Sequence, residues 1–242
     1  MRFGVCLHAA AVTRSSLPLH QSDRRAIALA LAAGAEVVVL ETVGQRGTAP
    51  HAAGAALAAG ATRVVRLVDP ALAGATAQGI GFAVATALDA LQVDLVLFGG
   101  DTDPDGVNDV PACVAHHMSA IYLDDVLDLK RSSAPVAGSA SVGLSTDSVE
   151  LTVRGTGWIR RARVPLNAVL GVAALDLPVA PGDAPAEKTA AQNAVRVITL
   201  AELNIDPALV GGRADGRPVI DAAARPLVTL QSGAAIATLL RR

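Results

Sequence analysis

The chain has 242 residues, of which 52% are hydrophobic, 17% are charged and only 2% are aromatic. This length allows one large core with an added arm or lobe. The formal net charge is -2, basic residues are scattered, and few rings are present on which bases could stack, so we expect no nucleic-acid partner. The apolar run at residues 3–7 is too short for a signal sequence or a membrane span, and we expect a cytoplasmic protein without membrane insertion.

The first half of the chain alternates short apolar runs with alanine-rich segments of helical spacing. The apolar runs are typical of buried parallel strands and cover residues 3–7, 36–40, 63–68 and 94–98. The helical segments cover residues 23–33, 49–59, 76–91 and 107–118. Asp23 and Thr76 are the expected N-caps, and Gly34 and Gly60 stand where a helix end favours positive φ. This alternation predicts an α/β fold in three Rossmann-like layers, with helices on the faces of a mostly parallel sheet.

Beyond residue 120 the pattern changes to strands separated by Ser, Gly and Pro, which we expect to extend the sheet in partly antiparallel fashion. These predicted strands are residues 121–129, 148–155, 158–164 and 168–174. Residues 177–191 are rich in Pro, Gly and Ala and indicate an exposed linker.

The tail that follows the linker has too little apolar surface to fold alone. It comprises the segment at residues 195–200, a predicted short helix at 200–203, a glycine-rich stretch through Gly216 and a predicted final helix at 232–242. We therefore divide the chain into a core domain at residues 1–192 and a C-terminal arm at residues 193–242, which should lie on its own domain or wrap a partner.

Loops at the carboxyl ends of parallel strands converge on one crevice, where ligands bind. The four loops that qualify are residues 7–11, 41–47, 69–74 and 99–111. The last contains Asp101, Asp103, Asp105 and Asp109, and three interpretations stay open: a nucleotide site, a solvated acidic loop that caps a helix at Asn108 or Asp109, and a calcium site. The calcium interpretation is the weakest, because the bidentate Glu that closes an EF-hand loop is missing and the loop follows a strand.

The sequence shows no set of residues for acid–base, nucleophilic or metal-assisted catalysis. His116 and His117 are adjacent on a predicted helix and cannot chelate one metal together. Cys6 and Cys113 lie in apolar runs, where a buried, inert thiol is expected. We therefore predict no metal and no catalytic residue.

Several blocks together resemble the β subunit of electron transfer flavoproteins over nearly the whole chain. They are the opening strand Met1-Arg2-Phe3-Gly4-Val5, Asp23 followed by Ala26-Ile27-Ala28, Gly60-Ala61-Thr62-Arg63-Val64-Val65, Asp94-Leu95-Val96-Leu97-Phe98-Gly99, residues 165–172, Leu200-Ala201-Glu202-Leu203-Asn204-Ile205-Asp206 and residues 226–240. Each block is weak alone, but their order and spacing are fairly specific. The resemblance implies a fold of the adenine nucleotide alpha hydrolase type.

The resemblance also implies a heterodimer in which an α subunit holds most of the FAD. The β subunit would contribute a wall near the flavin, a structural AMP and a tail that wraps the partner. Electrons would pass from a flavoprotein dehydrogenase to a membrane quinone reductase of the respiratory chain, so the chain would be an electron carrier subunit without acid–base residues of its own. The residues that the resemblance implies for cofactor binding are Cys6, Val43, Gly99, Thr102, Asp105, Asn108, Asp109 and Val110.

Two departures from the family pattern concern ligand and partner. Where the family has Asn-Gln-Thr-Gly at a helix N-terminus, this chain has Asn108-Asp109-Val110-Pro111, which replaces an amide by a carboxylate, loses a hydroxyl and removes a backbone donor. We therefore expect the AMP site to be altered or lost. The family's docking loop has an exposed Leu before Pro, whereas this chain has Ala184 before Pro185, which indicates a divergent electron donor.

Two alternatives stay open beside the electron-carrier interpretation. One is a related subunit kept for assembly or regulation without electron transfer. The other is a free-standing adenine nucleotide-binding protein of the universal-stress type, which would share the sheet but lack the partner-wrapping tail.

Overall fold

The computed structural model describes residues 1–7, 19–43, 50–73, 75–99, 109–132, 147–173 and 195–211. The strands are β1 (Arg2–Leu7), β2 (Glu36–Val43), β3 (Arg63–Val68), β4 (Leu95–Gly99), β5 (Ile121–Ser132), β6 (Ser148–Gly155), β7 (Trp158–Pro165), β8 (Ala168–Val172) and β9 (Val195–Ile198). The helices are α1 (Gln21–Ala32), α2 (Pro50–Ala58), α3 (Ala77–Ala90), α4 (Val110–His117) and α6 (Pro207–Val210), with a 3-10 helix η2 (Pro70–Leu72).

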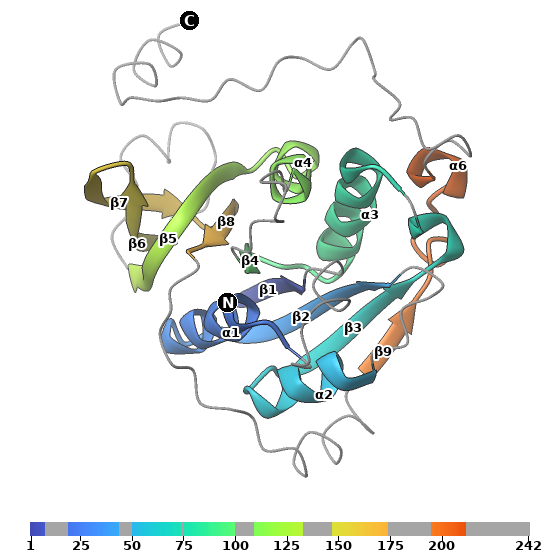
Figure 1. Cartoon of the computed structure of the whole chain (residues 1–242), viewed down its shortest axis with the longest axis horizontal. Coiled ribbons are helices and arrows are strands. Elements are labelled where there is room, and N and C mark those ends of the chain that lie inside the picture. Colours follow the sequence, from blue (N-terminus) through green and yellow to red (C-terminus); the bar gives the residue numbers. More distant parts are fainter. Residues whose placement is uncertain are drawn as a thin grey trace, which may run out of the picture.

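All the described strands belong to one sheet with the order β7-β6-β5-β8-β4-β1-β2-β3-β9 (Figure 1). The pairs from β5 through β8, β4, β1, β2 and β3 to β9 are parallel. The pairs β5 with β6 and β6 with β7 are antiparallel. The expected parallel sheet with an antiparallel extension is confirmed.

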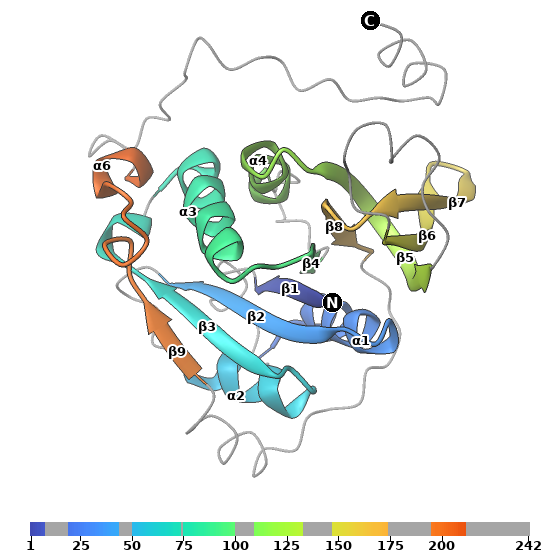
Figure 2. The same ribbon diagram turned by 180° about the vertical axis from the view of Figure 1, so that it is seen from behind.

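The sheet is the middle of three layers. Helices α1 and α2 cover one face, while α3 and α4 cover the other, as Figures 1 and 2 show from opposite sides. Both faces of the parallel strands are therefore buried. This explains why their sequences are continuous apolar runs and do not alternate between apolar and polar residues.

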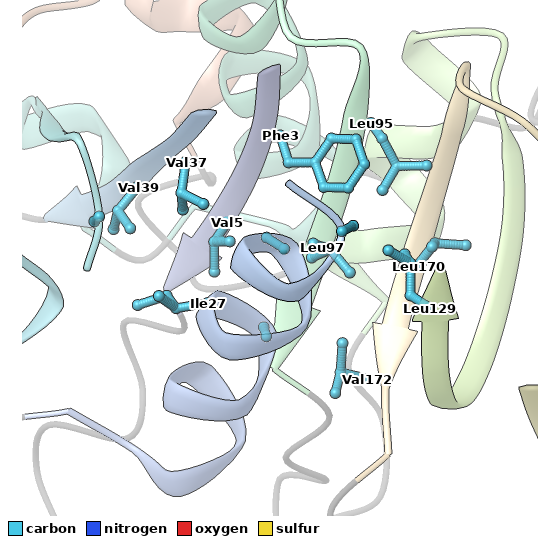
Figure 3. Packing of buried hydrophobic residues seen from close by; sticks show 14 of the residues in the cluster. Phe3, Val5, Ile27, Val37, Val39, Leu95, Leu97, Leu129, Leu170 and Val172 are labelled. Carbon is cyan, nitrogen blue, oxygen red and sulfur yellow. The ribbon is translucent and has the colours of Figure 1, made fainter. Parts of the chain in front are cut away.

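Two hydrophobic clusters, one on each face, hold the layers together. On the α1 face, Phe3, Val5 and Leu97 of the sheet pack with Ile27 of α1 (Figure 3). On the α3 face, Leu88 of α3 packs in one cluster with strand residues such as Val38 and Val96. Full burial of one such side chain contributes about 1.5–3 kcal/mol. The core is thus made mainly of aliphatic side chains, as the low aromatic content requires.

The helix ends follow most of the expected capping chemistry. The Thr76 hydroxyl accepts a hydrogen bond from the Gly79 amide at 3.1 Å, and Gly34 and Gly60 have φ of 72° and 106°, so these predictions are confirmed. The assignment of Asp23 as an N-cap was wrong. Helix α1 begins at Gln21, and the His20 ring accepts from the Ser22 amide at 3.3 Å. Asp23 lies in the first turn, where the helix dipole favours a carboxylate.

The tail begins on the core. Strand β9 pairs in parallel with β3 and becomes the last strand at that edge of the described sheet. The helix predicted at residues 200–203 was wrong, because Leu200 to Asn204 form hydrogen-bonded turns closed by Asn204 at φ 55°. A short helix, α6, follows instead, and the Asp206 carboxylate accepts from the Ala208 amide at 2.9 Å at its start.

Buried apolar side chains fasten this first part of the tail. Leu200, Ile205 and Val210 belong to the same hydrophobic cluster as α3. Helix α6 contacts α3 and η2. The predicted linker at residues 177–191 and the final helix at 232–242 lie outside the described residues.

Candidate ligand crevice at the carboxyl edge of the sheet

The strand order places a topological switch point between β1 and β4. The chain passes from β1 through α1 to β2 on one side, whereas β4 lies on the other side of β1. In open parallel sheets, ligands bind outside the carboxyl ends of the strands at such a point. Here these ends carry Cys6 and Leu7 of β1 and Phe98 and Gly99 of β4, and Cys6 is the register partner of Phe98.

The first turn of α1 lies directly against the end of β4. A methyl group added at Gly99 would clash with a carboxylate oxygen of Asp23, and it would come within 2.7 Å of the Ser22 hydroxyl oxygen. Both polar side chains are buried, and Asp23 is only 3% exposed. Glycine is thus required at position 99 because the helix N-terminus itself occupies the space beside the strand end.

The charge of Asp23 also reaches β1. Burial raises the pKa of the Cys6 thiol, and the nearby Asp23 carboxylate raises it further. A thiol with a raised pKa stays protonated and is a poor nucleophile or metal ligand. The expected burial is confirmed for Cys6, whereas Cys113 on α4 is only half-buried.

A buried ion pair lies one strand farther along the same edge. Glu41 of β2 is the register partner of both Leu7 of β1 and Arg66 of β3. The Arg66 guanidinium Nε donates to the Glu41 carboxylate at 2.7 Å, and Glu41 is only 5% exposed. Burial raises the pKa of Glu41, and the Arg66 charge opposes that rise. The pair fixes two charged side chains at the edge where a ligand would bind.

The start of α4 lies where the family resemblance places the AMP phosphate, at a site that the sequence predicts to be altered or lost. Asp109 is the N-cap residue, but its carboxylate makes no capping hydrogen bond and is exposed. Pro111 lies within the first two helical positions and offers no N–H group. Burial raises the pKa of Tyr122 on β5, and the nearby carboxylates of Asp124 and Asp109 raise it further.

The structure brings together only part of the predicted cofactor set. Cys6 and Gly99 lie on adjacent strands at the switch point, and Asp109 and Val110 begin α4. Val43 ends β2, although its side chain is not described. Thr102, Asp105 and Asn108 lie outside the described residues, as does most of the acidic loop on which the calcium and nucleotide interpretations depend.

Sequence reasoning missed the structural roles of Asp23, Glu41 and Arg66. The signal available for Glu41 was a carboxylate at the end of an otherwise apolar strand, which needs a partner of opposite charge when buried. Within the part of the chain that the structure describes, no three His, Cys, Asp or Glu side chains are grouped to hold a metal ion.

The fold and this edge define a Rossmann-like α/β protein of three layers with a crevice at the carboxyl ends of its strands. A family model described as the electron transfer flavoprotein domain matches residues 11–203. The match spans well over half of the 242 residues, and the chain belongs to the electron transfer flavoprotein domain family.

No curated protein matches the chain. Among solved structures, the chain is similar to glycinamide ribonucleotide transformylase 1 from Symbiobacterium toebii, with 16% sequence identity, coverage of 92% of this chain and 91% of that chain, and a TM-score of 0.29. A likeness at that TM-score carries no argument about fold or function. No helix among the described elements is both long and apolar enough to cross a membrane.

Proposed function

We propose that this chain is the β-type subunit of an electron transfer flavoprotein. With an FAD-holding α-type subunit it would accept electrons from a flavoprotein dehydrogenase and pass them to a quinone reductase of the respiratory chain. The observation that carries this proposal is the family match over residues 11–203. The β-type assignment rests on the order and spacing of the sequence blocks from Met1 to residue 240.

The described crevice does not fit an FAD held by this chain alone. Asp23 and Ser22 fill the space beside Gly99, where a dinucleotide would approach the switch point. The flavin pyrophosphate needs N–H groups or cations, whereas the Asp109 carboxylate is exposed at the start of α4 and the Asp23 carboxylate is buried beside Gly99. This supports a division of labour in which the partner holds the flavin phosphates and this chain forms a wall beside the cofactor.

A flavin accepts and gives electrons by its own chemistry, and a protein around it supplies binding, orientation and electrostatics. The contribution proposed for this chain is to hold the carboxyl ends of the parallel strands in a fixed position beside the cofactor. The buried Glu41–Arg66 pair and the α1 N-terminus both serve that purpose, because each locks a side chain at a strand end. The AMP site is proposed to be altered or lost, with Asp109 and Pro111 as the cause.

The test compares the chain purified alone with the chain co-expressed with an α-type subunit. We expect no flavin absorption from the chain alone and about one FAD per heterodimer. Stoichiometric flavin on the isolated chain would contradict the proposed division of labour. A heterodimer that binds FAD but transfers no electrons from any flavoprotein dehydrogenase would support an assembly or regulatory subunit, and a homodimer with bound ATP would support the universal-stress alternative.

A further inference from the structure

A pocket of about 460 Å³ lies between α3 and α4, which are neighbours on one face of the sheet (Figures 1 and 2). Helix α3 ends before β4 begins and α4 ends before β5 begins, so both helix C-termini lie toward the amino ends of the parallel strands. Asn167, which directly precedes β8, also lines the pocket. The pocket is therefore at the opposite end of the strands from the carboxyl-edge crevice. Its volume is within the range of roughly 300–1,000 Å³ that is typical of small-molecule sites.

Negative charge dominates the polar part of this pocket. Asp89 lines it and is exposed in the last turn of α3, a turn without a basic residue. A helix C-terminus carries partial negative charge, which disfavours a carboxylate there, and α4 ends at the same pocket. Arg2 donates to the Leu91 carbonyl at 2.9 Å just beyond α3, but its guanidinium is paired with Glu36 at 3.1 Å. Among the described residues, Asp89 has no ion-pair partner, so its charge is left for a ligand to compensate.

The imidazole of His117 at the end of α4 does not cancel this charge. Partial burial lowers the pKa of His117 and the neighbouring His116 lowers it further, while a hydrogen bond to the Gln78 backbone opposes the shift. The ring is therefore mainly neutral at neutral pH, and a neutral imidazole has one nitrogen that accepts a hydrogen bond. The described lining of the pocket thus offers acceptors and a carboxylate, and it contains no lysine or arginine.

The pocket also holds one of the few aromatic side chains of this protein. The chain has three phenylalanines, of which Phe3 and Phe98 are buried in the core, whereas Phe82 is only partly buried and lines the pocket. The Phe82 ring centroid lies 5.4 Å from that of His117. Phe82 and Asp89 are two turns apart on the same side of α3. The face of an aromatic ring attracts cations, so a ring near a carboxylate suits a cation with an apolar part.

Other classes of ligand fit this lining less well. A phosphate or carboxylate ligand would meet Asp89 and two helix C-termini without a lysine or arginine to bind it. A metal ion would need more ligands, and no three His, Cys, Asp or Glu side chains of the described chain are grouped to hold one. A docked protein would cover exposed apolar surface, but none of the large apolar side chains that the described ranges leave exposed lines this pocket.

We propose that the α3–α4 pocket binds a small organic cation, with an ammonium or guanidinium group on an apolar body. The Asp89 carboxylate pairs with the cationic group, and the Phe82 ring contacts the apolar body. His117 provides an additional hydrogen-bond acceptor. This site lies apart from the carboxyl edge, and the inference does not depend on the proposed electron-carrier function.

The experiment uses three probes of nearly the same shape and different charge: benzamidine, benzamide and benzoate. Isothermal titration of the full-length chain measures their dissociation constants. We expect cationic benzamidine to bind about tenfold more tightly than neutral benzamide, because only benzamidine gains the ion pair and the cation–ring contact. Benzoate should not bind. Equal affinities for the three probes, or no binding of benzamidine, would overturn the inference.

Two variants at one position test the role of Asp89. Asp89→Asn should raise the dissociation constant of benzamidine about fivefold and leave that of benzamide unchanged, since it removes a single exposed ion pair. Asp89→Lys should abolish benzamidine binding, and it should also raise the thermal midpoint of the unliganded chain, because a cation is favoured at a helix C-terminus. The matched control is Asp128→Asn, a half-exposed carboxylate on β5 outside the pocket lining. The same benzamidine affinity in Asp89→Asn and in the control would contradict the proposed site.

Titration of the heterodimer distinguishes a free molecule from a basic side chain of the partner subunit. Benzamidine should bind the heterodimer as it binds the isolated chain. Loss of benzamidine binding on heterodimer formation would mean that the partner occupies the pocket, and it would overturn the choice of a free molecule. The titrations of the isolated chain test the inference even if no heterodimer forms, so its failure can be told apart from failure of the proposed function.

Discussion

Gly99 at the end of β4 lies so close to Asp23 in the first turn of α1 that no side chain fits between them. We predict that Gly99→Ala destabilises the protein by about 1–3 kcal/mol, the usual cost of overpacking a tight site. Chemical denaturation of the two proteins measures the difference.

A double-mutant cycle with Asp23→Ala identifies the cause. If the clash with the carboxylate dominates, Gly99→Ala should cost less in the Asp23→Ala background, although the Ser22 hydroxyl still limits the space. Equal costs in both backgrounds would show that the Asp23 contact does not explain the glycine.

The Glu41–Arg66 pair makes a second prediction. Arg66→Met should destabilise the protein by about 3–5 kcal/mol at neutral pH, because it leaves a buried carboxylate without its partner. The double variant Glu41→Gln with Arg66→Met should recover most of that loss. Thermal denaturation of the three variants tests this, and a double variant as unstable as Arg66→Met would exclude the unpaired charge as the cause.

The same carboxylate predicts a pH dependence. Burial raises the pKa of Glu41 above its ordinary value of 4.5 in the folded protein. Between the unfolded and folded pKa values the folded state binds more protons, so the contribution of Glu41 to stability is present below pH 4.5 and is lost as pH rises through the folded pKa. Glu41→Gln should remove this slope from a plot of unfolding free energy against pH, whereas Glu36→Gln on the same strand is the control. An identical slope in Glu41→Gln would contradict the assignment.

A pair of truncations separates the two parts of the tail. Truncation after residue 193 removes β9 and the buried Leu200, Ile205 and Val210, so it should destabilise the core domain itself. Truncation after Gly211 leaves the described core intact, and we predict that it weakens the heterodimer without changing the thermal midpoint of the isolated chain. Size-exclusion chromatography with the partner and thermal melts of the chain alone measure the two effects. A chain ending at Gly211 that binds its partner at wild-type affinity would contradict the proposed wrapping arm.

The nucleotide content of the purified heterodimer tests the altered AMP site. We predict substantially less than one AMP per complex, because a phosphate at the start of α4 would meet the Asp109 carboxylate and would lack the Pro111 amide. Asp109→Gln with Val110→Thr and Pro111→Gly should raise AMP occupancy. One AMP per wild-type complex, measured after denaturation, would refute the prediction.

The periodic features of the fold were predictable from sequence, whereas the contacts of the candidate site were not. Strand β3 and strand β6 match their predicted bounds because a run of β-branched residues between turn residues is a local signal. Asp23 fills the space beside Gly99 at the end of β4, which lies more than seventy residues later in the sequence. No local sequence pattern predicts that contact. The turn at Leu200 was mistaken for a helix because its apolar residues are spaced like the apolar face of a helix. In the structure they pack into the hydrophobic cluster that also contains α3.

Strand β9 joins the sheet beside β3 although Val195 pairs with Val64 across 131 positions of sequence. During synthesis, the edge of β3 that pairs with β9 therefore stays unpaired until most of the chain has left the ribosome. Contacts of such long range slow folding, and an unpaired apolar strand invites wrong partners in the meantime. An incomplete chain that ends before β9 would thus be a substrate for chaperones and proteases, which gives the cell a means to remove unfinished copies.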